Sequence, residues 1–291
     1  MTVENMKEKI SAWVNANREQ IISRLSELVQ VGSPTGQEQA IVKKIKELYE
    51  LSGAQPLLIS SERSQMKTHA AYIDTTEMGC PETYEGRPNV VVIRKGSGNG
   101  RSLILNAHCD TIGVSEPGKW TRPPFSGQIA DGKIFGRGAA DDKSGIAIGM
   151  AVLELLDALN LRLKGDLIVQ NVIEEEAGGN GTLQCVMAGQ RADGAIILEN
   201  VGMGMIVCGS RGVHFFKITI YGEPVSILNL WEKPSSLDHA CKLYEAIKEF
   251  NVKRNASIPV HPLWGMYPLT MPKAPIAVMQ IVGGRDPSTT P

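Results

Sequence analysis

Four short stretches of the sequence place imidazole or carboxylate side chains beside the ends of predicted strands. These are residues 106–110, 136–145 and 174–181, and the single Glu199. In open α/β sheets, binding sites usually lie at the carboxyl ends of the strands. The sequence therefore predicts that side chains from the four stretches lie close together and form one site.

His108 and Asp110 stand two residues apart at the end of the apolar run LILNA. Alternate residues of a strand point to the same face of a sheet, so we expect these two side chains on one side. The imidazole would then bind a metal ion, while the carboxylate accepts a hydrogen bond from the ring or from a neighbouring group. Taken alone, this pair also fits an ordinary polar surface.

Two adjacent aspartates, Asp141 and Asp142, follow a glycine turn and precede a predicted helix. Glycine allows a tight backbone path, and the start of a helix tolerates negative charge. One of the two aspartates is expected to cap the helix. A pair of aspartates is more than a cap requires, which favours a further role for the other.

Three consecutive glutamates, Glu174, Glu175 and Glu176, follow an apolar run that predicts a buried strand. Neighbouring carboxylates repel one another and are costly there without a compensating cation; a solvated charged turn is the alternative. Glu199 follows the run GAIIL and is uninformative by itself. Together with His108 and the aspartates, these acids suit a divalent cation, with zinc the first choice and cobalt or manganese also suitable.

Hydrophobic periodicity predicts the elements that position these residues. Helices are expected over residues 5–31, 38–51, 142–159, 181–188 and 235–250. Strands are expected over residues 56–60, 89–94, 102–107, 166–173, 194–198, 213–221 and 276–282, with 89–94 and 102–107 adjacent or forming a hairpin. This alternation predicts an α/β domain over residues 1–210 with a mostly parallel central sheet, and a smaller second domain over residues 211–291.

Composition excludes several classes of partner. The formal net charge is −1, from 30 basic and 31 acidic residues, which disfavours nucleic acid binding. There is no apolar run of about 18 residues, so a transmembrane span is not expected. The N-terminus is charged where a signal peptide would be apolar, and the five cysteines form no CxxC pair. A cytoplasmic protein is the simplest expectation.

Four ordered motifs resemble the metallo-aminoacylase and carboxypeptidase family, which includes acetylornithine deacetylase and succinyl-diaminopimelate desuccinylase. The motifs are NAHCDT at 106–111, W-x-x-x-P-F at 120–125, GRGAADDKSG at 136–145 and IEEEAGGNG at 173–181. The resemblance implies a zinc-exopeptidase-like catalytic domain with a smaller α+β lid or dimerisation domain. It also implies a two-metal site: His108 and Glu199 bind one ion, Asp141 bridges both, and Glu176 binds the other.

The resemblance further implies that Asp110 orients His108 and that Glu175 is the general base. A carboxylate beside a metal-activated water takes its proton and later passes it to the departing amine. The expected reaction is hydrolysis of the amide bond of an N-acyl amino acid, with a dipeptidase or carboxypeptidase as the alternative. Because the lid pairs two copies in relatives, a homodimer is also expected.

The chain departs from the family pattern after the lid begins. The last metal-binding histidine of the family has no counterpart before Pro291, and the stretch 222–228 lacks the usual lid histidine. The remaining histidines sit in no matching motif: His69, His214, His239 and His261. We therefore expect a C-terminally truncated chain with an incomplete lid, one metal position tighter than the other, and low activity of the chain alone.

Two further classes remain open. A non-catalytic binding or dimerising protein that keeps the fold would fit the missing histidine, although Glu175 and Asp110 are both present. A nucleotide-binding α/β protein is suggested only by glycine-rich turns. The stretch GRGAAD lacks the spacing and the lysine of a phosphate-binding loop, which disfavours this class.

Overall fold

The protein is described by a computed structural model that covers residues 2–202, 204–207, 209, 212–223, 225–226, 228, 235–259, 275–282 and 289–290. It divides into two compact units, Met1–Val207 and Cys208–Pro291. The roles of these units as a catalytic domain and a lid remain predictions. In the described part of the chain, no helix is long and apolar enough to cross a membrane.

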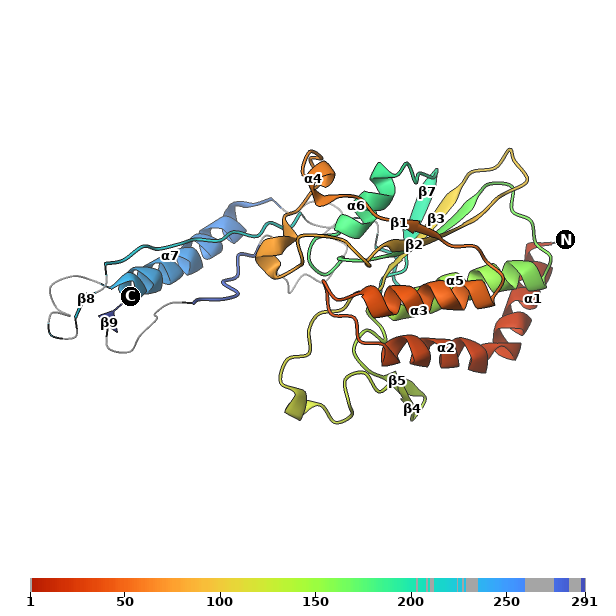
Figure 1. Cartoon of the computed structure of the whole chain (residues 1–291), viewed down its shortest axis with the longest axis horizontal. Coiled ribbons are helices and arrows are strands. Elements are labelled where there is room, and N and C mark those ends of the chain that lie inside the picture. The colour runs from red at the N-terminus through yellow and green to blue at the C-terminus, as the bar shows by residue number, and fades with distance from the viewer. Residues whose placement is uncertain are drawn as a thin grey trace. The chain divides into compact units, whose positions relative to one another are not determined.

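A five-stranded sheet forms the centre of the first unit, with strand order β1-β2-β6-β3-β7 (Figure 1). The strands are β1 (Leu57–Ile59), β2 (Asn89–Arg94), β3 (Leu103–His108), β6 (Leu167–Val172) and β7 (Gly194–Ile197). Strand β3 runs parallel to both β6 and β7, whereas β2 is antiparallel to β6 and to β1. The predicted α/β class is confirmed, but the sheet is mixed and not mostly parallel, because two of its strand pairs are parallel and two are antiparallel.

The predicted adjacency of residues 89–94 and 102–107 is wrong, because β6 lies between β2 and β3. The glycine-rich turn that joins them does not close a hairpin. Its Ser97 and Gly98 N–H groups donate to the carbonyls of Leu163 and Lys164, which precede β6. The turn therefore packs beside the entry to β6, and β6 takes the central place that its entirely buried residues require.

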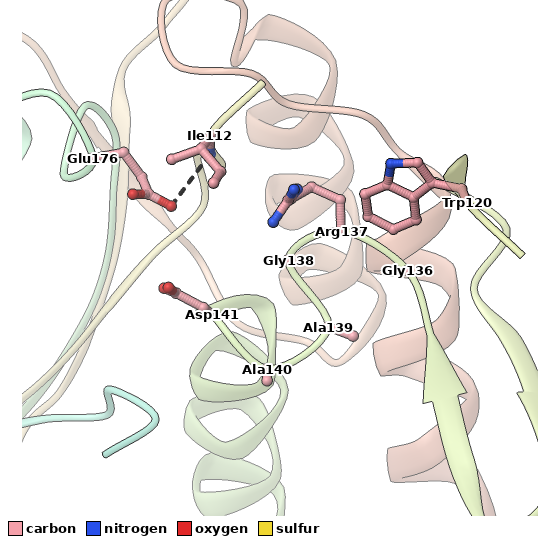
Figure 2. Close-up of a pocket in the computed structure, with 9 residues that line it drawn as sticks. All are labelled: Ile112, Trp120, Gly136, Arg137, Gly138, Ala139, Ala140, Asp141 and Glu176. Carbon is pink, nitrogen blue, oxygen red and sulfur yellow. Dashed lines mark hydrogen bonds between the residues drawn. The ribbon is translucent and has the colours of Figure 1, made fainter. Parts of the chain in front are cut away.

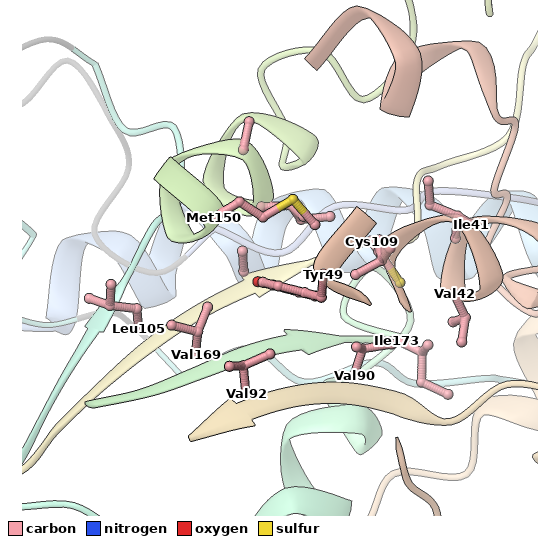
Figure 3. Close-up of a cluster of buried hydrophobic side chains, with 14 of the residues drawn as sticks. Ile41, Val42, Tyr49, Val90, Val92, Leu105, Cys109, Met150, Val169 and Ile173 are labelled. Atoms are coloured by element: carbon pink, nitrogen blue, oxygen red, sulfur yellow. The ribbon is translucent and has the colours of Figure 1, made fainter. Parts of the chain in front are cut away.

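Helices cover both faces of the sheet (Figure 1). On one face lie α2 (Arg18–Gln30), α3 (Gln39–Leu51) and α5 (Lys143–Ala158), and α6 (Asn180–Met187) packs on the other. Residues of β2 alternate between two cores, with Val90 and Val92 in the larger core and Val91 in the smaller. Figure 3 shows Val90 and Val92 on the same side as Tyr49 and Met150. This alternation is the two-residue period of a strand.

Two local features differ from the expected elements. The predicted helix over 5–31 is divided into α1 (Val3–Ala16) and α2, because Asn17 ends α1 and its side-chain amide donates to the Trp13 carbonyl at 2.8 Å. A short hairpin of β4 (Gln128–Ala130) and β5 (Lys133–Phe135) was not expected. Its turn, Asp131-Gly132, has positive φ at both residues, so the Asp-Gly dipeptide was an available signal.

Several short elements complete the first unit: α4 (Arg63–Met66) and the 3₁₀ helices η1 (Thr75–Met78) and η2 (Pro117–Lys119). These elements of three or four residues are too short to show a hydrophobic period, and the sequence did not predict them.

The second unit contains α7 (Ser236–Ser257) and the paired two-residue strands β8 (Val225–Ser226) and β9 (Thr289–Thr290). Helix α7 begins with a capping box between Ser235 and Asp238 and extends beyond the predicted end at 250. The predicted strands over 213–221 and 276–282 are wrong, since neither segment pairs with a strand among the described residues. Their apolar side chains, Phe215 and Phe216 among them, are largely exposed. His261, and Pro224 and Ile227 of the stretch 222–228, lie outside the described residues.

Candidate metal centre

The parallel strands bring three of the four predicted stretches to one edge of the sheet. Strand β3 ends at His108. Its neighbour in the sheet, β6, ends just before Glu174–Glu176, and its other neighbour, β7, ends two residues before Glu199. The fourth stretch leads into α5, which packs against β3 and presents Asp141 one residue before the N-cap. The side chain of His108 is 1% exposed, so its surroundings fix the orientation of its ring.

The two nitrogens of the His108 ring have different partners. Nδ1 lies 2.9 Å from the backbone oxygen of Asp110. Nε2 faces carboxylates: it lies 2.8 Å from Oδ1 of Asp141, 3.3 Å from Oε1 of Glu199 and 3.9 Å from Oε2 of Glu175. A backbone acceptor on one nitrogen leaves the other available to a metal ion.

Two overlapping sets of side chains could each hold a metal ion. The first set is His108, Glu175 and Glu199, and the second is His108, Asp141 and Glu176. Within each set the ligand atoms lie within 4.8 Å of one another. All five side chains named in these sets were singled out from the sequence, and the structure brings them together.

Asp110 positions the turn that carries the two glutamates. Its buried carboxylate accepts hydrogen bonds from the backbone N–H groups of Glu175 at 3.0 Å and Glu176 at 3.2 Å, and from the hydroxyl of Thr35 at 2.8 Å. The carboxylate is farther from the His108 ring, at 3.5 Å. Asp110 therefore contacts His108 mainly through its backbone carbonyl and holds the glutamate turn with its side chain.

Asp142 belongs to neither ligand set. Its carboxylate accepts from the Gly145 N–H at 3.2 Å, as an N-cap does, and from the His108 N–H at 3.2 Å. The expectation that one of the two aspartates caps the helix is confirmed. Burial raises the pKa of Asp142 to about 8, and the nearby Glu199 adds to this shift.

A buried ion network supports the glutamate turn from the opposite side. Glu174 is fully buried and lies 3.4 Å from Arg63 and 3.5 Å from Arg87. It also accepts hydrogen bonds from the Tyr84 hydroxyl at 2.7 Å and from the Asn180 amide at 3.1 Å. Sequence reasoning missed Arg63, Tyr84 and Arg87, because they come from separate short segments of the chain with no periodic pattern.

The electrostatics of the cluster suit a cation. Burial works against a charged His108, but hydrogen bonds with Asp110 and Glu199 outweigh it and raise the pKa of the ring to about 12. The hydrogen bond with His108 lowers the pKa of Glu199. Burial raises the pKa of Glu175 and of Glu176 by disfavouring the charged carboxylate, and repulsion from nearby acids raises both further.

The donor set fits a borderline divalent cation. One imidazole nitrogen and several carboxylate oxygens are ligands that zinc takes in proteins. The imidazole lies in both sets, and no second imidazole joins Asp141 and Glu176 among the residues that the structure describes. The cluster therefore offers two candidate positions that share a single imidazole.

A cavity of about 210 Å³ adjoins the cluster. Asp141 and Glu176 form one side of it, and Figure 2 shows Arg137 and Trp120 on the other. The Ile112 N–H donates to Oε1 of Glu176 at 3.2 Å and so fixes that carboxylate at the cavity wall. A small molecule in this cavity would contact the candidate metal ligands directly.

Comparisons with known proteins agree with this geometry. Residues 104–282 match the model of peptidase family M20/M25/M40. The N-formyl-4-amino-5-aminomethyl-2-methylpyrimidine deformylase of Halalkalibacterium halodurans is 34% identical over 215 residues, which are 69% of this chain and 44% of the relative. The succinyl-diaminopimelate desuccinylase of Methylobacterium radiotolerans is 35% identical over 157 residues, 50% of this chain and 38% of the relative.

Solved structures share the fold. Human carnosine dipeptidase 1 aligns with a TM-score of 0.51 and 17% identity, over 67% of this chain and 42% of that one. The dipeptidase Dug1p of Saccharomyces cerevisiae aligns with a TM-score of 0.50 and 17% identity, over 66% and 41%. The chain spans less than half of the length of each of these relatives.

Proposed function

Since the chain belongs to peptidase family M20/M25/M40, we propose that it supplies the metal-binding part of a hydrolase that cleaves the amide bond of a small N-acylated amine. The observation that carries this proposal is the convergence of His108 with four carboxylates at one edge of the sheet. The pattern of an imidazole and acids around a small cavity is that of a hydrolytic metal site.

The names of the relatives favour deacylation over peptide cleavage. One is a deformylase and the other a desuccinylase, and both names describe removal of an acyl group from nitrogen. An N-acyl amino acid is therefore our leading substrate class, and a dipeptide or C-terminal peptide bond is the alternative. The dipeptidase structures support the fold alone, at 17% identity.

We assign one ion to His108, Glu199 and the shared Asp141, and a second to Asp141 and Glu176. Zinc is the default ion, and cobalt or manganese also suits these ligands. A bound divalent cation would supply Lewis acidity, which lowers the pKa of water and polarises a carbonyl oxygen. Asp110 would hold the ring of His108 and the turn of the two glutamates in place.

Glu175 is our candidate for the general base. Its side chain is 47% exposed, so a water molecule can reach its Oε2 atom, while its backbone N–H is fixed by Asp110. Burial raises the pKa of this carboxyl, which brings it nearer to the working pH of a base. It would take a proton from water and return it to the nitrogen of the departing amine.

Among the described residues, only His108 supplies an imidazole to the two candidate metal positions. We propose that the position with His108 binds its ion more tightly and that turnover by this chain alone is low. A protein that keeps the fold and binds without turnover is the competing proposal. A homodimer through the second unit and a cytoplasmic location remain predictions.

Metal content of the purified chain, measured by elemental analysis, tests the proposal. We expect about one zinc per chain, lost in His108→Ala and kept in His69→Ala, since His69 is exposed and belongs to neither ligand set. No metal in the unsubstituted chain would favour the non-catalytic protein. Two equally tight zinc ions with robust turnover would contradict the unequal positions.

A further inference from the structure

The cavity beside the metal cluster has one basic side chain in its wall. Asp141 and Glu176 line one side, and Arg137 lines it together with Trp120 and Ile112. In Figure 2 the guanidinium end of Arg137 points toward the space between Ile112, Glu176 and Asp141. A cationic group thus faces the same small space as the candidate metal ligands.

Arg137 has no ion pair and no side-chain hydrogen bond to any residue that the structure describes. Its Nε atom is buried without a partner, and its guanidinium lies 5.2 Å from the centre of the Trp120 ring. By contrast, the nearby Arg122 donates to Gln128 at 2.9 Å and lies 3.7 Å from Asp131. Because buried polar groups are almost always paired, the unpaired Nε points to a partner that the described residues do not supply.

The backbone fixes Arg137 at the cavity. The Arg137 N–H donates to the Pro124 carbonyl at 2.7 Å. The next residue, Gly138, has φ of +81°, and a Cβ there would lie 2.7 Å from Cγ2 of Thr111. The loop therefore packs tightly against Thr111, which lies just beyond the end of β3. This packing holds the backbone of Arg137 in place beside the cavity.

Resting on the function proposed above, we propose that Arg137 binds a carboxylate of the substrate and so selects anionic N-acyl compounds. A planar guanidinium matches a carboxylate with two parallel hydrogen bonds. The Trp120 ring and Ile112 suit a short aliphatic chain, and 210 Å³ is the volume of roughly seven liquid waters, enough for a four-carbon acid. The cluster of acids beside the cavity repels such an anion until a cation offsets it.

The carboxylate can come from either side of the amide bond. It can end the acyl group, as in a succinyl group, or belong to the amino acid that carries the acyl group. Both sources share the chemistry that Arg137 recognises, and matched ligands separate them. Succinate and monomethyl succinate differ by one charge on the acyl side, and N-acetylalanine and N-acetylalaninamide differ by one charge on the amine side.

Calorimetric titration of the zinc-loaded chain with these ligands tests the proposal. In at least one of the two pairs, the ligand with the extra charge should bind about 10- to 100-fold more tightly, as expected of a hydrogen bond to a charged group. Arg137→Gln should remove this preference, and Arg122→Gln should keep it, because Arg122 stacks on Phe135 outside the cavity lining. The pair that responds identifies the side of the amide.

The proposal is overturned if Arg137→Gln keeps the same preference for the charged ligand as the unsubstituted chain. It is also overturned if the unsubstituted chain shows no preference in either ligand pair, which would favour a neutral substrate. Failure of the metal site is a separate outcome. If the chain takes up no zinc, the same titrations are made with the double variant Asp141→Asn, Glu176→Gln, which lacks the repelling charges. Loss of the ligand preference on adding Arg137→Gln to that variant then supports the anion site even though the proposed function fails.

Discussion

Replacing Arg87 by methionine is expected to lower the free energy of unfolding by about 3–5 kcal/mol, because it breaks a buried ion pair and strands a charge. The Arg87 side chain is 1% exposed, and its Nη1 lies 2.7 Å from Oε2 of the fully buried Glu38. Glu38 otherwise accepts a hydrogen bond from the Gly36 N–H at 2.9 Å. One backbone donor cannot offset the loss of a buried cation.

Two further variants test this reasoning. Combining Arg87→Met with Glu38→Met removes both charges, and it should recover most of the loss, since a buried pair and apolar residues of similar volume are often equivalent. Glu174 keeps Arg63 in this double variant. Arg94→Met breaks a pair with Asp157 whose side chains are 36% and 58% exposed, and it should cost less than about 1 kcal/mol.

The loss in Arg87→Met should depend on pH. Burial raises the pKa of Glu38, and Arg87 pulls it back down, so the variant has a still higher pKa at this carboxyl. A carboxyl with a raised pKa in the folded state binds more protons when folded, so stability falls as pH rises through that pKa. The deficit should therefore be smallest near a pH of about 4 and grow toward neutral pH.

Urea denaturation followed by circular dichroism, at several pH values, measures these effects. In a thermal scan, a loss of this size lowers the midpoint of a unit of about 200 residues by about 6–20 °C. An Arg87→Met variant within 1 kcal/mol of the unsubstituted chain would refute the reasoning. A double variant no more stable than the single one would show that packing, and not the stranded charge, sets the cost.

Three other predictions follow from the described geometry. Gly138→Ala should lower the free energy of unfolding by about 1–3 kcal/mol in thermal unfolding. The loss should exceed that of Gly132→Ala, because both glycines have positive φ but of the two only Gly138 lacks space for a Cβ. Equal losses in the two variants would contradict this. Chelation should destabilise a chain loaded with zinc at 100 times its Kd by about 2.7 kcal/mol, and a similar effect in His108→Ala would rule out the cluster as the zinc site. In a zinc titration, Glu199→Ala should weaken the first ion bound and Glu176→Ala the second, and the reverse order would invert our assignment.

Much of the fold could be predicted because hydrophobic period and element type are local. The two-residue period of β2 and β6 and the 3.6-residue period of α3 and α5 are visible in the sequence, and the structure has these elements. Strand order is not local. The position of β6 between β2 and β3 depends on where the turn at 96–100 packs, and that contact, with Lys164 and Gly165, has no sequence signature.

In the second unit, a strand-like pattern in the sequence does not form a strand. Residues 213–221 alternate as a half-buried strand would, yet the described segment pairs with no strand and leaves Val213 and Phe215 largely exposed. A two-residue period indicates only that a segment is able to form a strand. Whether the strand forms depends on a partner whose hydrogen bonds complete the ladder, and period alone does not supply one.

The three consecutive glutamates show how the site could be predicted only in part. Adjacent acids at the end of a buried strand are costly without a compensating cation. For one of the three glutamates the chain itself supplies the compensating charge, because Glu174 turns inward to Arg63 and Arg87. Its φ of +58° lets the backbone reverse there.

Glu175 and Glu176 turn the other way, and Asp110 binds their N–H groups but adds a further negative charge. Their compensation cannot come from the arginines behind them, which are already paired. His108 supplies a single positive charge for several carboxylates. The acids that face the cavity thus retain an excess of negative charge that a divalent cation would balance, and this excess is the physical reason to expect a metal ion here.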